Sequence, residues 1–160
     1  MEKQHALQQL EQLQKKLYAI HYACSAMNLD ADTVAPRNTS VGRGVALGVL
    51  AGEEQQLMIC PETRALLDEL DRQKDELDLL HRREVEELRR RCDQLTRIPA
   101  EEYIAYSELV NKAGDVWHKA KEKDDFAMFC PLLQELVEYN RKFAAYYDST
   151  RAPYDALLNG

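Results

Sequence analysis

Apolar residues at the start of the chain recur in steps of three and four, the spacing that places side chains on one face of an α-helix. The residues that share this stripe are Leu7, Leu10, Leu13, Leu17, Ile20, Cys24 and Met27. The pattern predicts a first helix over residues 1–27 with one face covered by a partner. From Asn28 to Ser40 the stripe gives way to polar residues, and Pro36 disfavours helix at Ala35. The sequence therefore predicts a loop over residues 28–40.

Small residues distinguish the next predicted helix. Ser40 is placed to cap a helix over residues 41–59, because a serine hydroxyl can accept a hydrogen bond from a free N–H group of the first turn. Inside that helix each glycine would cost up to about 1 kcal/mol against alanine, and the glycines concerned are Gly42, Gly44 and Gly48. Their presence favours close packing of this helix against a neighbour.

A third helix and a charged arm complete the predicted helices of residues 41–96. Pro61 suits the first turn of a helix over residues 62–71, since a helix leaves the N–H group at that position unbonded in any case. Residues 74–96 combine many charges with one apolar stripe, which comprises Leu77, Leu80, Val85, Leu88, Cys92 and Leu95. This stripe predicts either one long exposed helix or one arm of an antiparallel hairpin.

The last third of the chain predicts a helix pair over residues 99–150, followed by a tail over residues 151–160. Pro99 opens the first helix of the pair. The second begins near Asp124 or Asp125, and Pro131 lies inside it, so that a restart or a kink is expected there. The predicted fold class is all-α: a single helical domain over residues 1–160, with five to seven helices and long antiparallel helix pairs.

Charge and composition narrow the range of partners. The formal net charge is −7, with 45% apolar and 31% charged residues, a mixture typical of a folded helical protein. The largest basic cluster, residues 89–91, is a poor match for nucleic acid or an anionic membrane. No apolar signal region opens the chain, and no apolar run approaches the roughly 20 residues of a membrane span. We therefore expect a cytoplasmic protein that binds neither nucleic acid nor membranes.

The cysteines give no sign of a disulfide or a metal centre. Cys24, Cys60, Cys92 and Cys130 are far apart and contain no C-x-x-C pair. We expect them to be reduced core residues. Cys130 has no histidine near it in the sequence that would activate it as a nucleophile.

The polar residues give no strong catalytic candidate. A zinc hydrolase commonly uses two histidines one helical turn apart with a nearby glutamate. The four histidines are too widely separated for that arrangement: His5, His21, His81 and His118. Three carboxylate pairs are interpreted as solvated surface charge, namely Glu53 with Glu54, Glu86 with Glu87, and Asp124 with Asp125. The sequence analysis assigns no catalytic, cofactor-binding or metal-binding residue to this chain.

Three further patterns have structural interpretations. Gly42, Arg43 and Gly44 resemble a phosphate loop only superficially, because no strand precedes them and no Gly-Lys-Ser/Thr follows. The acidic run from Asp30 to Thr33 lacks the further oxygen ligands of a calcium loop. Aromatic side chains at helical spacing are expected to pack in a core or an interface, and they are Tyr103, Tyr106, Trp117, Tyr139, Tyr146 and Tyr147.

Two segments resemble a known family. Between Glu108 and Pro131 the spacing is similar to a helix pair of pattern A-W-x-x-A-R-x-x-N-D-F-x-x-F-x-P, through Trp117, Ala120, Asp124, Asp125, Phe126, Phe129 and Pro131. The similarity continues through Leu133, Val137, Arg141 and residues 153–158. The earlier segment over residues 29–36 resembles W-D-x-E-T-x-M-P, with Leu29, Asp32 and Ala35 in place of its Trp, Glu and Met. Both patterns are found in the carboxypeptidase Taq metallopeptidases, and the chain resembles the N-terminal helical segment of that family.

The resemblance implies a zinc-dependent metallocarboxypeptidase that removes C-terminal residues from peptides, with zinc (or cobalt) in the full-length enzyme. The family's H-E-x-x-H zinc helix has no counterpart in this chain. By analogy these residues form one wall of the substrate groove, are not catalytic by themselves and hold no cofactor. The implied partners are the missing C-terminal catalytic half, peptides, and a second copy of the chain in a homo-oligomer.

Two other functions stay open at this point. One is a free-standing helical module for protein interaction or dimerisation, which would act through exposed aromatic and leucine stripes. The other is an independent enzyme that uses a lone cysteine or histidine. If the chain is part of a larger fold, we expect an exposed apolar patch that self-association would cover.

Overall fold

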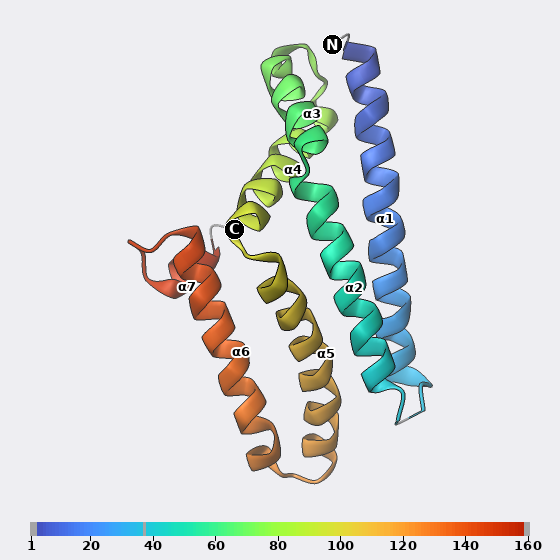
Figure 1. Ribbon diagram of the computed structural model, residues 1–160, viewed down its shortest axis with the longest axis vertical. Helices are drawn as coiled ribbons and strands as arrows, with labels where there is room; N and C mark the ends of the chain where they lie inside the picture. The colour runs from blue at the N-terminus through green and yellow to red at the C-terminus, as the bar shows by residue number, and fades with distance from the viewer. Residues whose placement is uncertain (1–2, 37, 159–160) are drawn as a thin grey trace.

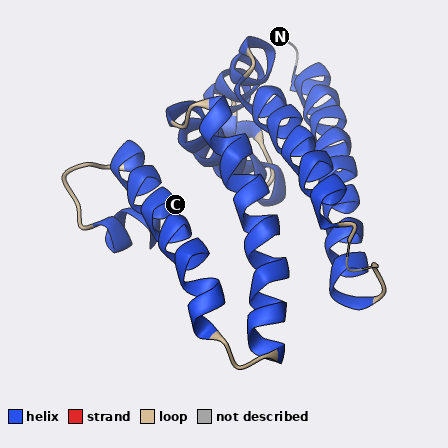
Figure 2. Ribbon diagram, turned by 60° about the horizontal axis from the view of Figure 1, so that its bottom comes forward, coloured by secondary structure: helices blue, strands red, loops and turns tan. Residues whose placement is uncertain are grey.

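The computed structural model describes residues 3–36 and 38–158, and its regular elements are helices throughout (Figure 2). In chain order they are α1 (Lys3–Thr33), α2 (Ser40–Ile59), α3 (Pro61–Arg72), the short 3₁₀ helix η1 (Lys74–Glu76), α4 (Leu79–Arg97), α5 (Ala100–Glu122), α6 (Phe126–Tyr147) and α7 (Pro153–Leu158). The all-α prediction is confirmed.

The four longest helices lie side by side in a row. In Figure 1 the order across the row is α6, α5, α2, α1, and neighbours run in opposite directions. The most extensive contact in the row is between α2 and α5, followed by that between α5 and α6. Helices α3 and α4 form a hairpin at the end of the row where the chain begins, and α7 packs against α6. The predicted long antiparallel pairs are therefore present.

Buried apolar side chains form two separate clusters. The larger joins α1, the end of α2 and the α3/α4 hairpin through Ala6, Leu10, Leu13, Leu17, Met58, Leu66, Leu67, Leu70, Leu77, Val85, Cys92 and Leu95. The smaller lies between α5 and α6 and comprises Leu109, Ala113 and Leu132. Consequently the α5/α6 hairpin is held by a much smaller core than the rest of the molecule.

Helix α1 is longer than the sequence predicted. It ends at Thr33, so most of the loop expected over residues 28–40 is helical. Asn28, Asp30 and Asp32 are exposed polar residues, and the intrinsic helix propensity of each is lower than that of alanine by less than about 1 kcal/mol. Without a glycine or proline before Pro36, nothing in this stretch ends the helix.

The glycines of α2 explain its close contact with α5. A Cβ atom at Gly44 would lie 2.9 Å from Asn111 Nδ2, and one at Gly48 would lie 2.9 Å from Glu108 Oε1. Packing is thus confirmed as the reason for these two glycines, whereas a Cβ at Gly42 would meet nothing within 4 Å. Ser40 is the first helical residue and not the expected cap, since Thr39 holds the N-cap position and makes no side-chain capping bond.

A buried amide fixes the corner between α4 and α5. Gln55 of α2 is fully buried, and its Nε2 donates to the carbonyl oxygens of Leu95 at 3.2 Å and Ile98 at 2.8 Å. Those carbonyls belong to the end of α4, where backbone acceptors lack helical partners. Gln55 therefore joins α2 to the point where the chain turns into α5.

The charged arm begins later than predicted. Pro61 opens α3 as expected, but the helix expected from residue 74 starts at Leu79, after a 3₁₀ turn. Asp78 caps it, accepting a hydrogen bond from the His81 backbone N–H at 2.9 Å. Of the two forms considered for this arm, the antiparallel hairpin is present. Leu80, predicted on its buried stripe, is instead exposed because it lies in the first turn of α4.

Helix α6 runs through its proline without a restart. Its N-cap is Asp125, whose carboxylate accepts from Met128 N–H at 3.2 Å, and Pro131 lies inside the helix. The preceding Asp124 has a φ of 51°, a left-handed conformation that aspartate tolerates better than most residues. The predicted tail also contains structure, because residues 153–158 form α7.

Candidate functional site

A cleft of about 550 Å³ lies among α1, α2 and α5. Its lining includes Cys24, Asn28 and Asp32 from α1, Arg43, Leu47 and Glu54 from α2, and Tyr103, Ser107, Val110, Gly114, Asp115 and His118 from α5. Small and apolar side chains occupy the middle of the α2 wall, and charged side chains occupy its ends. A cleft of this volume is large enough for a small ligand or a short peptide.

A buried carboxylate marks one end of the cleft. Glu54 is only 6% exposed, and its Oε1 lies 2.9 Å from His21 Nε2. The Arg91 guanidinium, from α4, also donates to this oxygen. The prediction that Glu53 and Glu54 are both solvated surface charge is therefore wrong for Glu54. An arginine partner offsets the cost of burying its charge.

A second polar group marks the other end. Arg43 Nε donates to Asn111 Oδ1 at 3.0 Å, and Arg43 Nη2 donates to Asp115 Oδ1 at 2.8 Å. Asn111 Nδ2 in turn donates to the Ser40 carbonyl oxygen at 3.1 Å. These bonds hold the start of α2 against the middle of α5, so Arg43 acts as a structural clamp and not as part of a phosphate loop.

The rim of the cleft carries a looser contact. His118 Nε2 lies 3.4 Å from Asp32 Oδ1, and both side chains are more than half exposed. Asp32 belongs to the run that the sequence placed in a loop, and the helical conformation of α1 turns it toward α5 instead. The pair joins the end of α1 to α5 across the cleft.

Burial keeps the proton on two groups in this cleft. Desolvation, reinforced by the nearby Glu54 carboxylate, raises the pKa of the Cys24 thiol. The same two causes raise the pKa of Tyr103, with Arg91 acting in the opposite direction. A cysteine nucleophile needs a lowered pKa, so Cys24 does not have the setting of a catalytic thiolate.

Each histidine of the described chain has polar neighbours of its own. His21 contacts Glu54, His118 contacts Asp32, His81 contacts Asp78 at 2.8 Å, and His5 contacts Gln9 at 3.2 Å. No group of three or more histidine, cysteine, aspartate or glutamate side chains that could hold a metal ion occurs within residues 3–36 and 38–158. The structure thus leaves the four histidines separated.

The cysteines are free, but only one is a core residue in the full sense. Cys92 is buried, Cys24 and Cys60 are half-buried, and Cys130 is exposed. The expectation of four core cysteines is wrong for Cys130, which is exposed on α6.

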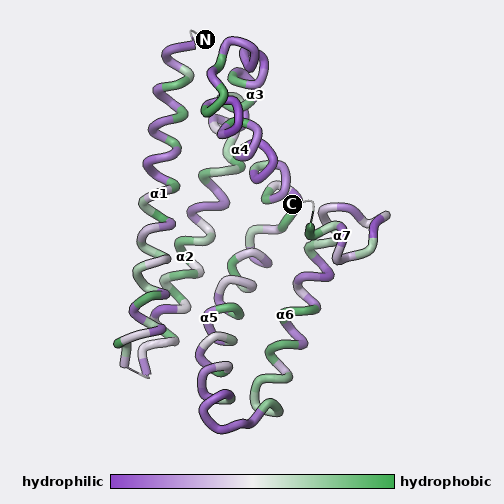
Figure 3. Tube along the Cα trace, turned by 180° about the vertical axis from the view of Figure 1, so that it is seen from behind, coloured by the Kyte–Doolittle hydropathy of each residue, from purple (hydrophilic) through white to green (hydrophobic). Residues whose placement is uncertain are grey.

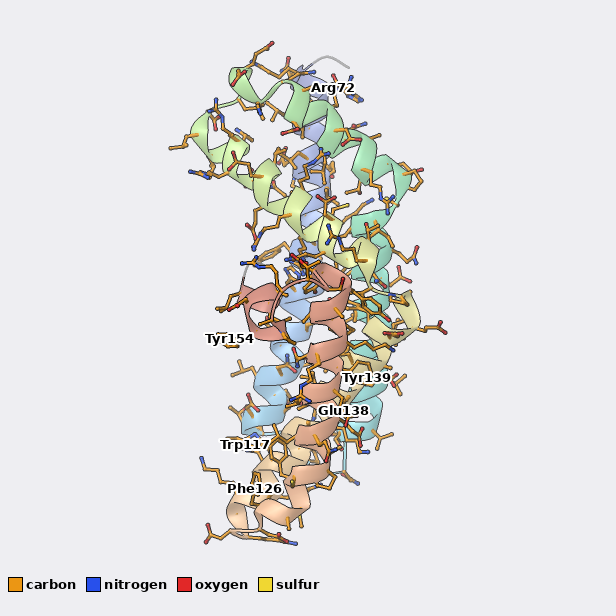
Figure 4. The ribbon with its side chains drawn as sticks, turned by 90° about the vertical axis from the view of Figure 1, so that its left-hand side faces the viewer. Arg72, Trp117, Phe126, Glu138, Tyr139 and Tyr154 are labelled. Carbon is orange, nitrogen blue, oxygen red and sulfur yellow. The ribbon has the colours of Figure 1, made fainter. Side chains whose placement is uncertain are left out.

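The aromatic residues divide between packing and exposure. Tyr106, Tyr139 and Phe143 form a cluster between α5 and α6, with ring centroids 5.1 to 5.8 Å apart. Helix packing is confirmed for these rings. Trp117 is 42% exposed and Phe126 64% exposed, and Figure 4 shows both near the turn that joins α5 to α6.

None of the described helices is long and apolar enough to cross a bilayer.

Exposed apolar residues form stripes on two helices. On α6 the stripe comprises Phe126, Leu133 and Val137, and on α2 it comprises Val41, Val45 and Val49. The early turns of α6 are drawn as hydrophobic in Figure 3, while much of α4 is hydrophilic. Stripes at helical spacing on an isolated chain are typical of surfaces that another part of a protein covers.

Comparison with known proteins identifies the family to which this arrangement belongs. The sequence profile of the carboxypeptidase Taq (M32) metallopeptidases matches residues 9–160. The chain belongs to this family. Carboxypeptidase 1 of Bacillus subtilis is 34% identical over 141 residues, which cover 87% of this chain and 28% of the relative.

Solved structures of M32 relatives share the helical arrangement. A crystal structure of a protein called BsuCP superposes with a TM-score of 0.92 and 31% identity, over 97% of this chain and 31% of that one. Metallocarboxypeptidase 1 of Trypanosoma cruzi gives a TM-score of 0.72 and 30% identity, again over 97% of this chain and 31% of that one. This M32 chain therefore spans less than a third of the relatives it matches, and a free-standing interaction module is not favoured.

The polar groups of the cleft are the feature that sequence reasoning missed. Arg43, Leu47, Ala51, Glu54 and Met58 recur at steps of three and four, so they share one face of α2. Since Leu47 and Met58 are apolar, that face was identifiable as buried from the sequence alone. The partners Arg91 and Asp115 were not, because they come from α4 and α5 and depend on tertiary packing.

Proposed function

We propose that this chain is the N-terminal part of a metal-dependent carboxypeptidase that removes C-terminal residues from peptides. In this proposal residues 1–160 form one helical domain that builds a wall of the substrate groove. They position and cover the catalytic groups and supply none of them. Catalysis belongs to the longer part of the protein, with which this chain pairs.

One observation carries the proposal. The chain superposes on BsuCP with a TM-score of 0.92 while it matches only 31% of that structure. Because almost the whole of this chain superposes so closely, we infer that it occupies the same position in its full-length enzyme as the matching segment does in BsuCP. In this proposal the residues that hold the metal lie in the part of the enzyme outside this chain.

The metal we propose is zinc, or cobalt in its place, bound outside this chain. Such an ion supplies a bound water of lowered pKa and polarises the peptide carbonyl. The contribution of the described residues is steric and electrostatic, since they limit which peptides reach the metal. The family's description as metallopeptidases supports the metal, and its identity is our inference.

We further propose that the protein is cytoplasmic and forms a homo-oligomer. The four free cysteines suit a reducing compartment. Apolar stripes are exposed on two separate helices, α2 and α6. One would contact the rest of the same chain, and the other would contact a second copy.

A chimera tests the proposed function. This chain would replace the matching segment of Bacillus subtilis carboxypeptidase 1, and turnover of an N-blocked dipeptide would be measured with and without a chelator. We expect turnover within about tenfold of the unmodified enzyme, because one wall of the groove is exchanged for a similar one. Loss of activity in the chelator and recovery with zinc or cobalt would support the proposed metal. A folded chimera without turnover would contradict the role of this chain as an equivalent wall.

A further inference from the structure

Gly114 is a glycine that the internal packing does not explain. It lies in the interior of α5, its φ is not positive, and an added Cβ would meet no atom within 4 Å. A glycine in a helix interior costs about 1 kcal/mol relative to alanine. Gly44, Gly48 and Gly52 differ, because a Cβ at each would crowd a side chain of α5.

The open space next to Gly114 is the cleft. Gly114 is among the cleft's lining residues, so a larger side chain there would occupy part of its volume. A glycine at such a position allows a ligand's backbone to approach closely. The bare surface of α5 thus suggests an occupant whose main chain crosses this point.

The walls of the cleft suit a peptide main chain. Asn28 on α1 and Ser107 on α5 both line it, and within the part of the chain that the structure describes neither side chain is engaged in a hydrogen bond. They can donate to and accept from backbone amide groups. Leu47 and Val110 provide apolar contact between the polar ends.

Charge and length define the peptide further. At one end of the cleft Arg43 Nη2 donates to Asp115 Oδ1, whereas Asp32 is 66% exposed and its contact is with the His118 ring, whose Nε2 lies 3.4 Å from Asp32 Oδ1. The Asp32 carboxylate therefore has exposed surface open to a basic side chain, and the net charge of −7 disfavours a phosphate. From Arg43 to Glu54 the α2 wall extends about 16 Å at 1.5 Å per residue. An extended peptide covers that length with about five residues.

We propose that the cleft among α1, α2 and α5 binds an extended peptide of about five residues, with its backbone against Gly114 and a basic side chain near Asp32. That this peptide is the upstream part of a carboxypeptidase substrate rests on the proposed function. The binding itself does not, because it requires only residues of this chain.

The test uses a peptide with both termini blocked, so that no terminal charge contributes. Acetyl-Ala-Ala-Lys-Ala-Ala-amide is titrated into the 160-residue chain while the backbone amide signals of Ser107 and its neighbours are followed by NMR. We expect a saturable shift of these signals. The same peptide with Glu in place of Lys should bind several-fold more weakly, since its carboxylate would lie near that of Asp32.

Gly114→Leu blocks the cleft and Gly42→Leu is its matched control. Both glycines leave open space for a Cβ, but Gly42 is not among the residues that line the cleft. We expect Gly114→Leu to weaken binding at least about tenfold, with an unchanged or raised Tm because leucine favours helix more than glycine. Gly42→Leu should bind as the unmodified chain does. Equal binding by Gly114→Leu would overturn the proposal.

Asp32→Asn tests the basic side chain separately. Asp32 is 66% exposed, so its replacement leaves the packing intact. We expect the lysine peptide to bind about twofold to fivefold more weakly to this variant at low salt, and the difference to shrink as salt is added. Binding of the lysine and glutamate peptides with equal affinity would contradict the charge assignment. Because no catalysis is measured, failure here leaves the chimera result standing, and an inactive chimera leaves the binding result standing.

Discussion

At the scale of single residues, the most consequential group is the buried carboxylate of Glu54. Its neighbours come from three helices: His21 from α1, Arg91 from α4 and Tyr103 from α5. A carboxylate in such a place is stable only while a cation accompanies it. Glu54 therefore makes the position of the α3/α4 hairpin depend on one arginine.

Replacement of Arg91 by alanine should destabilise the chain. The change leaves Glu54 buried with only His21 as a polar partner, and we expect a loss of about 2 kcal/mol in the free energy of unfolding, less than for a fully buried pair because Arg91 is partly exposed. Urea unfolding measures the loss. The matched control is Arg90→Ala, whose partner Glu87 is exposed and whose loss should stay under about 0.5 kcal/mol. Equal effects of the two variants would show that Glu54 needs no cation.

Asp78 should make the stability of α4 sensitive to acid. The hydrogen bond from the His81 backbone N–H, followed by the contact with the His81 side chain, holds the pKa of this carboxyl below its usual 3.8. A depressed pKa means that the stabilising effect is present above the unfolded value and is lost as the pH falls through the folded value. We expect the Tm of the unmodified chain to fall relative to that of Asp78→Asn below about pH 4, since asparagine caps a helix without titrating. A constant Tm difference across that range would rule out this contribution.

At the scale of elements, the contact between α2 and α5 organises the molecule. Gly44 and Gly48 allow the two helices to approach, and Arg43 and Asn111 join them at one end. The two glycines are not equivalent. Glu108 opposite Gly48 is exposed and can move, whereas Asn111 opposite Gly44 is held by bonds to Arg43 and to the Ser40 carbonyl.

Gly44→Ala should therefore destabilise the chain although alanine favours helix. The new methyl group would displace Asn111 and break its bonds, and we expect a net loss of about 1 kcal/mol in thermal unfolding. Gly42→Ala, where the methyl group meets open space, should leave the Tm unchanged or raise it slightly. A rise in Tm for both variants would mean that Asn111 adjusts without cost.

The helices could be predicted from sequence where one periodic stripe dominates. Leu10, Leu13 and Leu17 identified α1 correctly, and Pro61 and Pro99 marked the starts of helices. The end of α1 was placed too early because polar residues were interpreted as a loop, although an exposed helical turn also accepts them. Glu54 was interpreted as surface charge because the interpretation considered only that the residue is charged. It ignored that Glu54 lies on the same face of α2 as the apolar residues. Its partner Arg91 becomes visible only when α4 packs across α2.

At the scale of the whole molecule, the row of α1, α2, α5 and α6 resembles one layer of a larger fold. Its smaller core, between α5 and α6, contains only three buried residues among those described. Apolar stripes remain exposed on α2 and α6. A layer of this kind gains stability when another layer covers it.

Self-association of the isolated chain should depend on the α6 stripe. We expect the double substitution Leu133→Gln and Val137→Gln to shift the chain toward the monomer in sedimentation experiments, because it removes apolar surface that a second copy would cover. Glu135→Gln, on an exposed position of the same helix, should leave the distribution unchanged. The Tm of the double variant should also stay close to the original, since both side chains are partly exposed. If the unmodified chain is already monomeric at high concentration, the α6 stripe does not mediate self-association.

The central claim is that this chain contributes the wall of a peptidase and none of its catalytic groups. Chelator-sensitive hydrolysis of an N-blocked dipeptide by the chain alone, with zinc or cobalt added, tests it most directly. The account predicts no turnover above the rate of the metal in buffer, and no metal retained after dialysis. Turnover that disappears with chelator and returns with metal would contradict the account, and substitution of His21 and His118 in turn would then locate the metal.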